Sequence, residues 1–221
     1  MVNSKITIVE NILSANDRIA EENLEFLNDR NIKAINIMAS PGAGKTSVIL
    51  QTIKTLITEF KIAVIEGDTA PVIIDSDKVG ALGVPVTQIN TGGACHLDAV
   101  MVRNGLRQLD LDGTDLVIIE NVGNLVCPAS FKLGTHFNLV IASVPEGDDK
   151  PYKYPGIYRG IDCLILNKID LLPYINFDQN YFSKGIETLN PGIEIFPLSC
   201  TTEEGFNSWI RWLRAHLIKK N

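Results

Sequence analysis

A glycine-rich segment, Ala39-Ser40-Pro41-Gly42-Ala43-Gly44-Lys45-Thr46, follows one apolar run and opens a helical one. A strand, a glycine-rich loop and a helix N-terminus in this order cradle phosphates, because backbone N–H groups and the positive end of the helix dipole face the anion. Ala39 replaces the first glycine of the usual pattern, which a negative φ would tolerate. Lys45 is the expected catalytic cation, and Thr46 an expected Mg²⁺ ligand. The predicted phosphate contacts are Pro41, Gly42, Ala43, Gly44, Lys45, Thr46 and Ser47.

A second motif, Asn167-Lys168-Ile169-Asp170, ends a later apolar run. A carboxylate at Asp170 can accept hydrogen bonds from guanine N1–H and the N2 amine, a donor pair that adenine lacks. We expect Lys168 to lie over the purine and Asn167 to brace the loops. Ser199, Cys200 and Thr201 are expected to offer backbone N–H to guanine O6. The two motifs together predict GTP and GDP as ligands, with an ATPase of the same superfamily as the alternative.

Acidic residues follow two of the apolar runs. Glu120 ends the run 116–119, the place of the carboxylate that holds Mg²⁺ or its water in nucleotide hydrolases of this kind. Asp68 and Asp75 are further Mg²⁺ candidates near the γ-phosphate. No glutamine stands out to orient the attacking water, so Asp68 is the predicted second catalytic residue. Lys153, with Lys150 as the alternative, is expected to reach the nucleotide in cis or from a partner subunit.

Cysteine and histidine form a third group. Cys95 and His96 precede a helical run, and Cys127 lies seven residues after Glu120. Two thiolates and an imidazole suit Zn²⁺, Ni²⁺ or Cu, but a closed structural zinc site needs four ligands. A two-fold axis could complete the set by presenting it twice. The alternative is that both cysteines are small buried residues and His96 caps a helix. The others, Cys163, Cys200, His136 and His216, are predicted to be structural or solvated.

These residues require elements that bring them together. Apolar runs predict strands at 32–38, 61–66, 84–89, 116–119, 139–142 and 163–166. Helical spacing predicts helices at 4–29, 45–59, 97–109 and 203–218. Alternating strands and helices indicate an α/β fold of the P-loop NTPase type, with a mostly parallel sheet flanked by helices. We predict an N-terminal helical arm at 1–30 and one G domain at 31–221. Ligands then bind at the carboxyl ends of the strands.

Composition excludes several other functions. The chain has 221 residues, 45% of them hydrophobic, which is enough for a sizeable core. Its 20 basic and 26 acidic side chains give a net charge of −6, so we expect no nucleic-acid partner. No apolar stretch reaches the roughly 20 residues of a membrane span, and the first residues do not form a signal peptide. Four cysteines predict reduced thiols in the cytoplasm rather than a disulfide framework.

Four segments resemble one family. These are Gly-Gly-Ala-Cys-His-Leu-Asp at 92–98, Glu-Asn-Val-Gly-Asn-Leu-Val-Cys-Pro at 120–128, Glu-Gly-Asp-Asp-Lys-Pro-Tyr-Lys-Tyr-Pro at 146–155 and Asn-Lys-Ile-Asp-Leu-Leu-Pro at 167–173. They are similar to the hydrogenase nickel-incorporation GTPases, the HypB family, from the glycine-rich loop to the last helix. The related urease GTPases, the UreG family, carry Cys-Pro-His in one stretch, so the separated Cys95-His96 and Cys127 fit the hydrogenase family better.

The resemblance implies a slow GTPase that forms a nucleotide- and metal-dependent homodimer. It implies delivery of Ni²⁺ to the large-subunit precursor of [NiFe]-hydrogenase, together with a HypA-type metallochaperone. Cys95, His96 and Cys127 then become the Ni²⁺ or Zn²⁺ site at the dimer interface. Residues 1–33 contain no cysteine or histidine, unlike the nickel-rich N-termini of some members. The alternatives are a urease-type nickel-insertion GTPase and a nucleotide-gated metal-binding scaffold with negligible hydrolysis.

Overall fold

The computed structural model describes residues 12–69 and 74–218 of the chain. Its seven described strands form one sheet in the order β3-β2-β4-β1-β5-β6-β7, and every neighbouring pair is parallel. The fold class predicted from the sequence is therefore confirmed. The strands are β1 (Lys33–Ala39), β2 (Ile62–Asp68), β3 (Val86–Asn90), β4 (Leu116–Glu120), β5 (Phe137–Ser143), β6 (Cys163–Asn167) and β7 (Glu194–Pro197).

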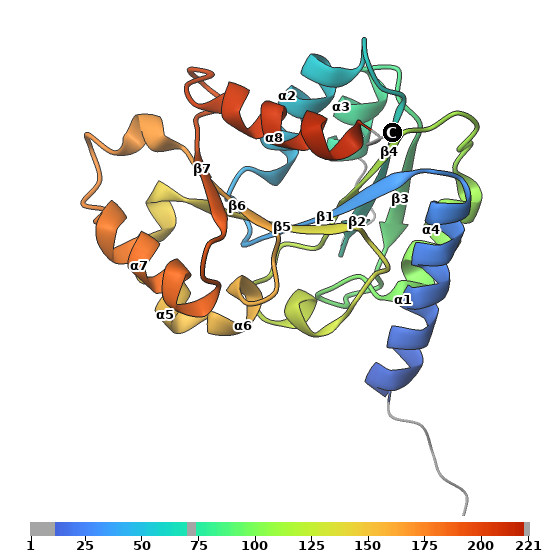
Figure 1. Cartoon of the computed structure of the whole chain (residues 1–221), viewed down its shortest axis with the longest axis horizontal. Coiled ribbons are helices and arrows are strands. Elements are labelled where there is room, and N and C mark those ends of the chain that lie inside the picture. The colour runs from blue at the N-terminus through green and yellow to red at the C-terminus, as the bar shows by residue number, and fades with distance from the viewer. Residues whose placement is uncertain (1–11, 70–73, 219–221) are drawn as a thin grey trace, which may run out of the picture.

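Helices cover both faces of the sheet (Figure 1). One face carries α2 (Lys45–Leu56), α3 (Ile74–Gly80) and α8 (Phe206–Leu217). The other carries α1 (Ile12–Asp29), α4 (Ala99–Gln108), α5 (Lys150–Lys153), α6 (Pro155–Tyr158) and α7 (Gln179–Leu189). Short 3₁₀ turns lie at Cys127–Ser130, Val144–Glu146 and Ile169–Leu171. Since both faces are covered, the central strands are rich in apolar residues, as in β4, where four buried apolar residues precede the buried Glu120.

The hydrophobic core consists of two layers, one on each side of the sheet. On the α2 and α8 side, Ile49 and Leu213 are fully buried, and Trp209 Nε1 donates to Thr52 Oγ1 at 2.9 Å. On the opposite side, one cluster lies under α6 and α7, and another lies under α1 and α4. Leu27 of α1 is fully buried in the latter cluster, so α1 packs against the rest of the molecule.

Each strand and helix predicted from the sequence is present at about its predicted position, and the differences lie at the ends of the elements. The predicted strand 84–89 begins at Val86, since Pro85 lacks the N–H that a sheet requires. Residues 4–11 of the first predicted helix lie outside the described residues. Helices α3, α5, α6 and α7 and strand β7 were not predicted. Helices α5 and α6 are single turns of four residues. Among the described helices, none is long and apolar enough to cross a membrane.

Candidate functional site

The glycine-rich loop leaves β1 at the centre of the sheet and enters α2 at Lys45. Gly44 has φ +99°, and a Cβ there would overlap the side-chain amide of Asn167, so only glycine fits. Ala39 is the last residue of β1 and has no positive φ, which explains why alanine is accepted at that position. The loop geometry is that of a phosphate cradle at a helix N-terminus.

The second motif lies against this loop. Asn167 ends β6, and its Nδ2 donates to Ala43 O at 3.0 Å. Lys168 has φ +62°, and its Nζ donates to Gly42 O at 2.6 Å. Two motifs more than 120 residues apart in sequence thus share one edge of the sheet. The side chain of Asn167 braces the phosphate loop, and the Lys168 stem lies beside it.

Asp170 carries an unusual oxygen. Its Oδ1 is buried and has no hydrogen-bond partner in the described part of the chain. A buried carboxylate oxygen without a partner is costly, so this atom is suited to a ligand donor such as guanine N1–H or its N2 amine. Burial, together with the charge of Asp170, raises the pKa of the neighbouring Cys200 thiol to about 11. Cys200 is therefore a neutral thiol close to Asp170.

The loop after β7 offers fewer backbone donors than the sequence suggested. The N–H of Ser199 is bonded to Glu204 O at 2.9 Å, and that of Thr201 to Ser199 Oγ at 3.1 Å. Of the three predicted donors to guanine O6, this leaves Cys200 as the candidate. The Ser199 hydroxyl fixes the shape of the loop.

Carboxylates meet the phosphate loop from the neighbouring strands. The Thr46 hydroxyl donates to Glu120 Oε1 at 3.1 Å, and Glu120 is buried at the end of β4. Asp68 ends β2, next to β4 in the sheet. A hydroxyl and carboxylates here are the hard oxygen ligands that Mg²⁺ prefers. The backbone of Asp75 lies in the first turn of α3, but its side chain lies outside what the structure describes.

One cavity of about 320 Å³ connects these groups with the cysteine cluster. Lys45, Asp68 and Glu120 line it together with Cys95. Glu66, which the sequence reading missed, is a further buried carboxylate in its wall, bonded to the Ser76 hydroxyl. Residues i and i+2 of a strand share a face, so Glu66 could have been found from Asp68.

The cluster itself brings three ligand atoms together. Cys95 Sγ lies 2.9 Å from Cys127 Sγ and 4.0 Å from His96 Nδ1, and all three ligand atoms lie within 4.8 Å of one another. The His96 ring stacks on Phe131 at 3.9 Å between centroids. Contact with Cys95 raises the pKa of the Cys127 thiol. Two sulfurs and one nitrogen at this spacing fit a borderline cation such as Zn²⁺ or Ni²⁺.

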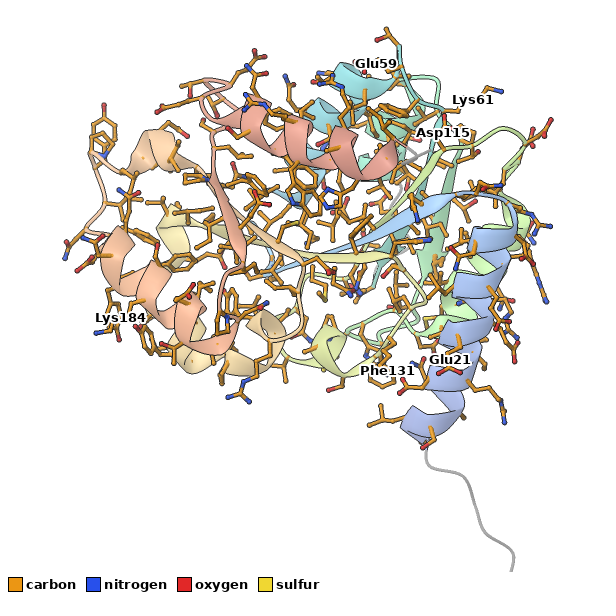
Figure 2. The ribbon with its side chains drawn as sticks, in the orientation of Figure 1. Glu21, Glu59, Lys61, Asp115, Phe131 and Lys184 are labelled. Atoms are coloured by element: carbon orange, nitrogen blue, oxygen red, sulfur yellow. The ribbon has the colours of Figure 1, made fainter. Side chains whose placement is uncertain are left out.

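Two asparagines connect the cluster to the nucleotide loop, and neither was predicted. Asn121 follows Glu120 directly and accepts the N–H of Leu97 at 3.1 Å through its Oδ1. The backbone of Asn124 donates to Ala39 O at 2.9 Å, and its side chain donates to Cys95 O at 3.2 Å. The segment between Glu120 and Cys127 is therefore hydrogen-bonded to both sites. Figure 2 shows Phe131, just beyond Cys127, on the same side of the sheet as Glu21 of α1.

Lys153 is not brought to the phosphate loop within this chain. It is the last residue of α5, it forms an ion pair with Asp149, which directly precedes that helix, and it does not line the cavity. Its segment is nevertheless connected to the loop, because the hydroxyls of Ser40 and Ser143 both donate to Glu146. The sequence predicted neither serine nor Glu146 as part of the site.

An all-parallel sheet, a glycine-rich strand–loop–helix unit and a carboxylate bonded to its threonine define a P-loop nucleotide-binding protein. The family model for the CobW/HypB/UreG nucleotide-binding domain matches residues 33–197. The hydrogenase maturation factor HypB of Escherichia coli K12 is 43% identical over 204 residues, spanning 92% of this chain and 70% of that protein. The chain belongs to the CobW/HypB/UreG family, in its HypB branch.

Solved structures agree with this assignment. HypB from Archaeoglobus fulgidus superposes with a TM-score of 0.87 and 38% identity, covering 93% of this chain and all of that one. HypB from Helicobacter pylori in complex with nickel superposes with a TM-score of 0.85 and 34% identity, covering 94% of this chain and 99% of that one.

Proposed function

We propose that this protein is a GTP-hydrolysing nickel chaperone that serves hydrogenase maturation. The observation that carries the proposal is the shared cavity, in which Lys45 and Glu120 of the nucleotide site lie with Cys95 of the sulfur–nitrogen cluster. A ligand bound at one end of such a cavity alters the field and the packing at the other. Nickel bound to the H. pylori relative supports the choice of metal.

Guanine selectivity rests on Asp170. Its orphaned buried oxygen gains a donor from guanine N1–H or N2–H and gains none from adenine. Thr46 and Glu120 would hold Mg²⁺ at the β/γ oxygens, with Asp68 as a further ligand. The ion supplies charge neutralisation on the transferring phosphoryl group.

Hydrolysis would proceed by attack of water on the γ-phosphorus, giving GDP and phosphate. Lys45 and the loop N–H groups stabilise charge on the phosphoryl oxygens. Asp68, the last residue of β2 and part of the cavity wall, orients the water. Lys153 lies outside the cavity in its own chain, so we assign it to the nucleotide of a partner subunit. Turnover by the monomer is accordingly slow.

Metal handling belongs to Cys95, His96 and Cys127, which are exposed or half-buried at the surface. Three donors leave a coordination position for a ligand from elsewhere, and a two-fold axis would supply it from a second copy. We therefore propose a homodimer closed by nucleotide and metal. Its partners would be a HypA-type metallochaperone and the hydrogenase large-subunit precursor. The thiols require a reducing compartment such as the cytoplasm.

Phosphate release from GTP tests the enzymatic half of the proposal. The wild-type protein should release phosphate from GTP and not from ATP, and Lys45→Ala should abolish the release. Lys54→Ala, on the same helix but near its C-terminal end, is the matched control. GTP bound without phosphate release would favour the scaffold alternative, and wild-type turnover by Lys45→Ala would refute the phosphate site.

Sedimentation tests the assembly half. We expect a dimer with a non-hydrolysable GTP analogue plus Ni²⁺ or Zn²⁺, and a monomer with GDP and no metal. A Cys95→Ala/Cys127→Ala variant should lose the metal dependence. A variant that binds metal as well as the wild type would show that other residues form the site.

A further inference from the structure

Helix α1 buries two asparagines in the stripe that faces the protein. The buried residues of this helix are Asn16, Ala20, Asn23 and Leu27, the spacing of a packing face. Asn16 is 6% exposed and Asn23 is 2% exposed. Leucine would bury more apolar surface at either position, so the two amides serve a different purpose.

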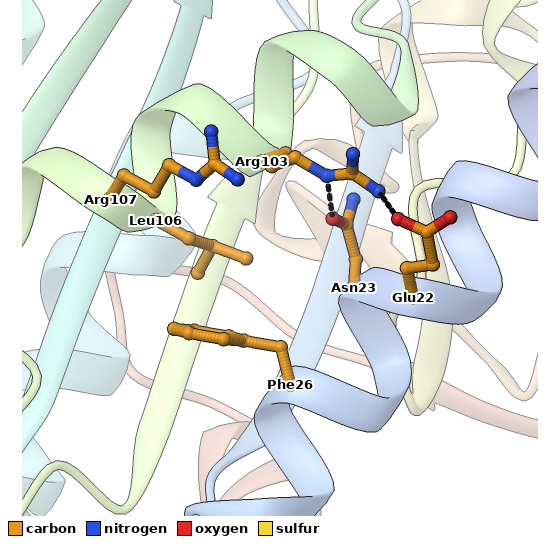
Figure 3. Close-up of a pocket in the computed structure, with 6 residues that line it drawn as sticks. All are labelled: Glu22, Asn23, Phe26, Arg103, Leu106 and Arg107. Carbon is orange, nitrogen blue, oxygen red and sulfur yellow. Dashed lines mark hydrogen bonds and ion pairs between the residues drawn. The ribbon is translucent and has the colours of Figure 1, made fainter.

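Asn23 connects α1 with two segments at once. Its Nδ2 donates to Ala99 O at 2.8 Å and to Leu133 O at 3.0 Å. Its Oδ1 accepts from Arg103 Nε at 3.4 Å, and the guanidinium of Arg103 also pairs with Glu22. Figure 3 shows Arg103 reaching from α4 to Asn23 and Glu22 of α1.

Asn16, two turns earlier, repeats the arrangement. Its Oδ1 accepts the N–H of Ala99 at 2.9 Å, and its Nδ2 donates to Lys132 O at 2.9 Å. Asp17 adds an ion pair with Lys132 at 3.0 Å. Each asparagine side chain therefore hydrogen-bonds the backbone of Ala99 and one backbone carbonyl of the segment 132–133.

Both bridged segments carry metal ligands. Ala99 lies three residues after His96, and Lys132 lies five residues after Cys127. At Gly134, φ is +85°, and a Cβ would overlap Ala20 O, so this segment runs in direct contact with α1. The two halves of the cluster belong to different loops, and the described contacts join both of them to one helix.

We propose that α1 is the frame that sets the spacing of the metal ligands, with Asn16 and Asn23 as its positioning residues. This rests on the proposed metal site. Removing either amide leaves buried backbone groups without partners, and the two loops then relax independently. Groups hydrogen-bonded directly to metal-ligating side chains commonly change metal affinity by roughly 10–100-fold, and the two asparagines act one step further out, through the backbone of the ligand segments. A binding partner that displaces α1 would likewise change the spacing of the ligands and therefore the metal affinity.

The test is a Ni²⁺ titration against a chromophoric chelator, with the Ni²⁺–thiolate absorption recorded in parallel. Asn23→Ala and Asn16→Ala should each weaken Ni²⁺ binding by about 10-fold, the lower end of the range for direct partners of the ligands, and shift the absorption band. Their affinity for a fluorescent GTP analogue should stay within about twofold of wild type. Asn23→Gln, which keeps the amide, should recover part of the affinity. Glu21→Ala, exposed on the same helix, is the matched control.

The outcomes separate the inference from the proposed function. Wild-type affinity in Cys95→Ser/Cys127→Ser would overturn the metal site itself. If that variant loses the metal while both asparagine variants keep wild-type affinity and absorption, the positioning role is overturned. If Asn23→Ala alone loses nucleotide binding, the positioning role is judged from the Ni²⁺ affinity and absorption band of Asn16→Ala. Loss of nucleotide binding in both variants would show a general structural role and would also overturn the inference.

Discussion

The side-chain oxygen of Asn121 accepts the backbone N–H of Leu97 at 3.1 Å. Asn121 directly follows Glu120, which lines the cavity beside the phosphate loop, and Leu97 directly follows His96 of the cysteine–histidine cluster. The side chain is fully buried, and its Nδ2 donates to Asn36 Oδ1 at 3.2 Å in the neighbouring strand. One amide therefore joins the end of β4, the centre of the sheet and the segment that carries Cys95 and His96.

Replacing Asn121 by alanine should cost stability and weaken coupling. The N–H groups of Leu97 and Val122 both lose their acceptor, so urea unfolding should show a loss of about 2–4 kcal/mol. The ratio of Ni²⁺ affinities with GTP analogue and with GDP should move toward one, because coupling is reciprocal between the two sites. Asn180→Ala, on the exposed side of α7, is the control. An unchanged ratio would assign the coupling to Asn124 instead.

Replacing Asp170 by asparagine should exchange the base preference. The NH₂ group of the new amide is a donor, so it cannot accept a hydrogen bond from guanine, but it can donate to the C2 carbonyl of xanthine. We expect GTP affinity to fall by about 3 kcal/mol, roughly 100-fold, and XTP to bind more tightly than GTP. Competition against a fluorescent nucleotide measures both affinities. Asp29→Asn, exposed at the end of α1, should change neither. Equal GTP binding by both variants would rule out a base contact at Asp170.

The sequence was sufficient to predict six of the seven described strands and the three motifs, because each has a local signature. Strand β7, with four residues, was not predicted. Buried parallel strands are continuous apolar runs, and the phosphate loop has a fixed residue order around Lys45. Cys95, His96 and Cys127 were predicted as a group, and the structure brings their ligand atoms within 4.8 Å. The asparagines could not be predicted. Asn16, Asn23 and Asn121 act through backbone groups that are distant in sequence, and no spacing rule reveals such contacts.

Short elements escaped prediction for a different reason. Helices α5 and α6 contain four residues each, little more than one helical turn, so neither can show a repeated hydrophobic spacing. Each also has proline in its first turn. The predicted role of Lys153 also goes beyond one chain. In this structure Lys153 pairs with Asp149, so a role at a nucleotide depends on a second subunit that a single sequence does not describe.

Replacing Glu120 by glutamine should weaken the Mg²⁺ site selectively. The carboxylate accepts the Thr46 hydroxyl at 3.1 Å, and an amide offers a much poorer ligand to Mg²⁺. The Mg²⁺ concentration that half-saturates GTP hydrolysis should rise about tenfold. This corresponds to the loss of one charged contact worth about 1.4 kcal/mol. Nucleotide binding without Mg²⁺ should change little. Glu59→Gln, at the surface opposite Arg214, is the control. An unchanged Mg²⁺ requirement would move the ligand role to Asp68 or Glu66.

His136 should make stability fall with acid. Burial, and to a smaller extent the charge of Lys33, lowers the pKa of His136 from its ordinary 6.5 to about 4. Its Nδ1 accepts the N–H of Ala34 at 3.0 Å, and its Nε2 lies 3.0 Å from Asn28 Oδ1 of α1. The neutral ring satisfies both contacts, whereas protonation at Nδ1 would place a hydrogen against the N–H of Ala34.

Because the pKa is lower in the folded state, the unfolded chain takes up a proton between pH 6.5 and pH 4 and the folded chain does not. The contribution of His136 to stability is complete above pH 6.5 and disappears as the pH falls toward 4. The His136 side chain is only half-buried, so we expect about 1–2 kcal/mol rather than the full value of the shift. Urea unfolding of metal-free protein from pH 7 to pH 4.5 measures it. In His136→Gln, stability at pH 7 should be lower than in wild type, and the slope over this range should be shallower. Equal slopes in wild type and His136→Gln would show that carboxylates alone cause the acid loss.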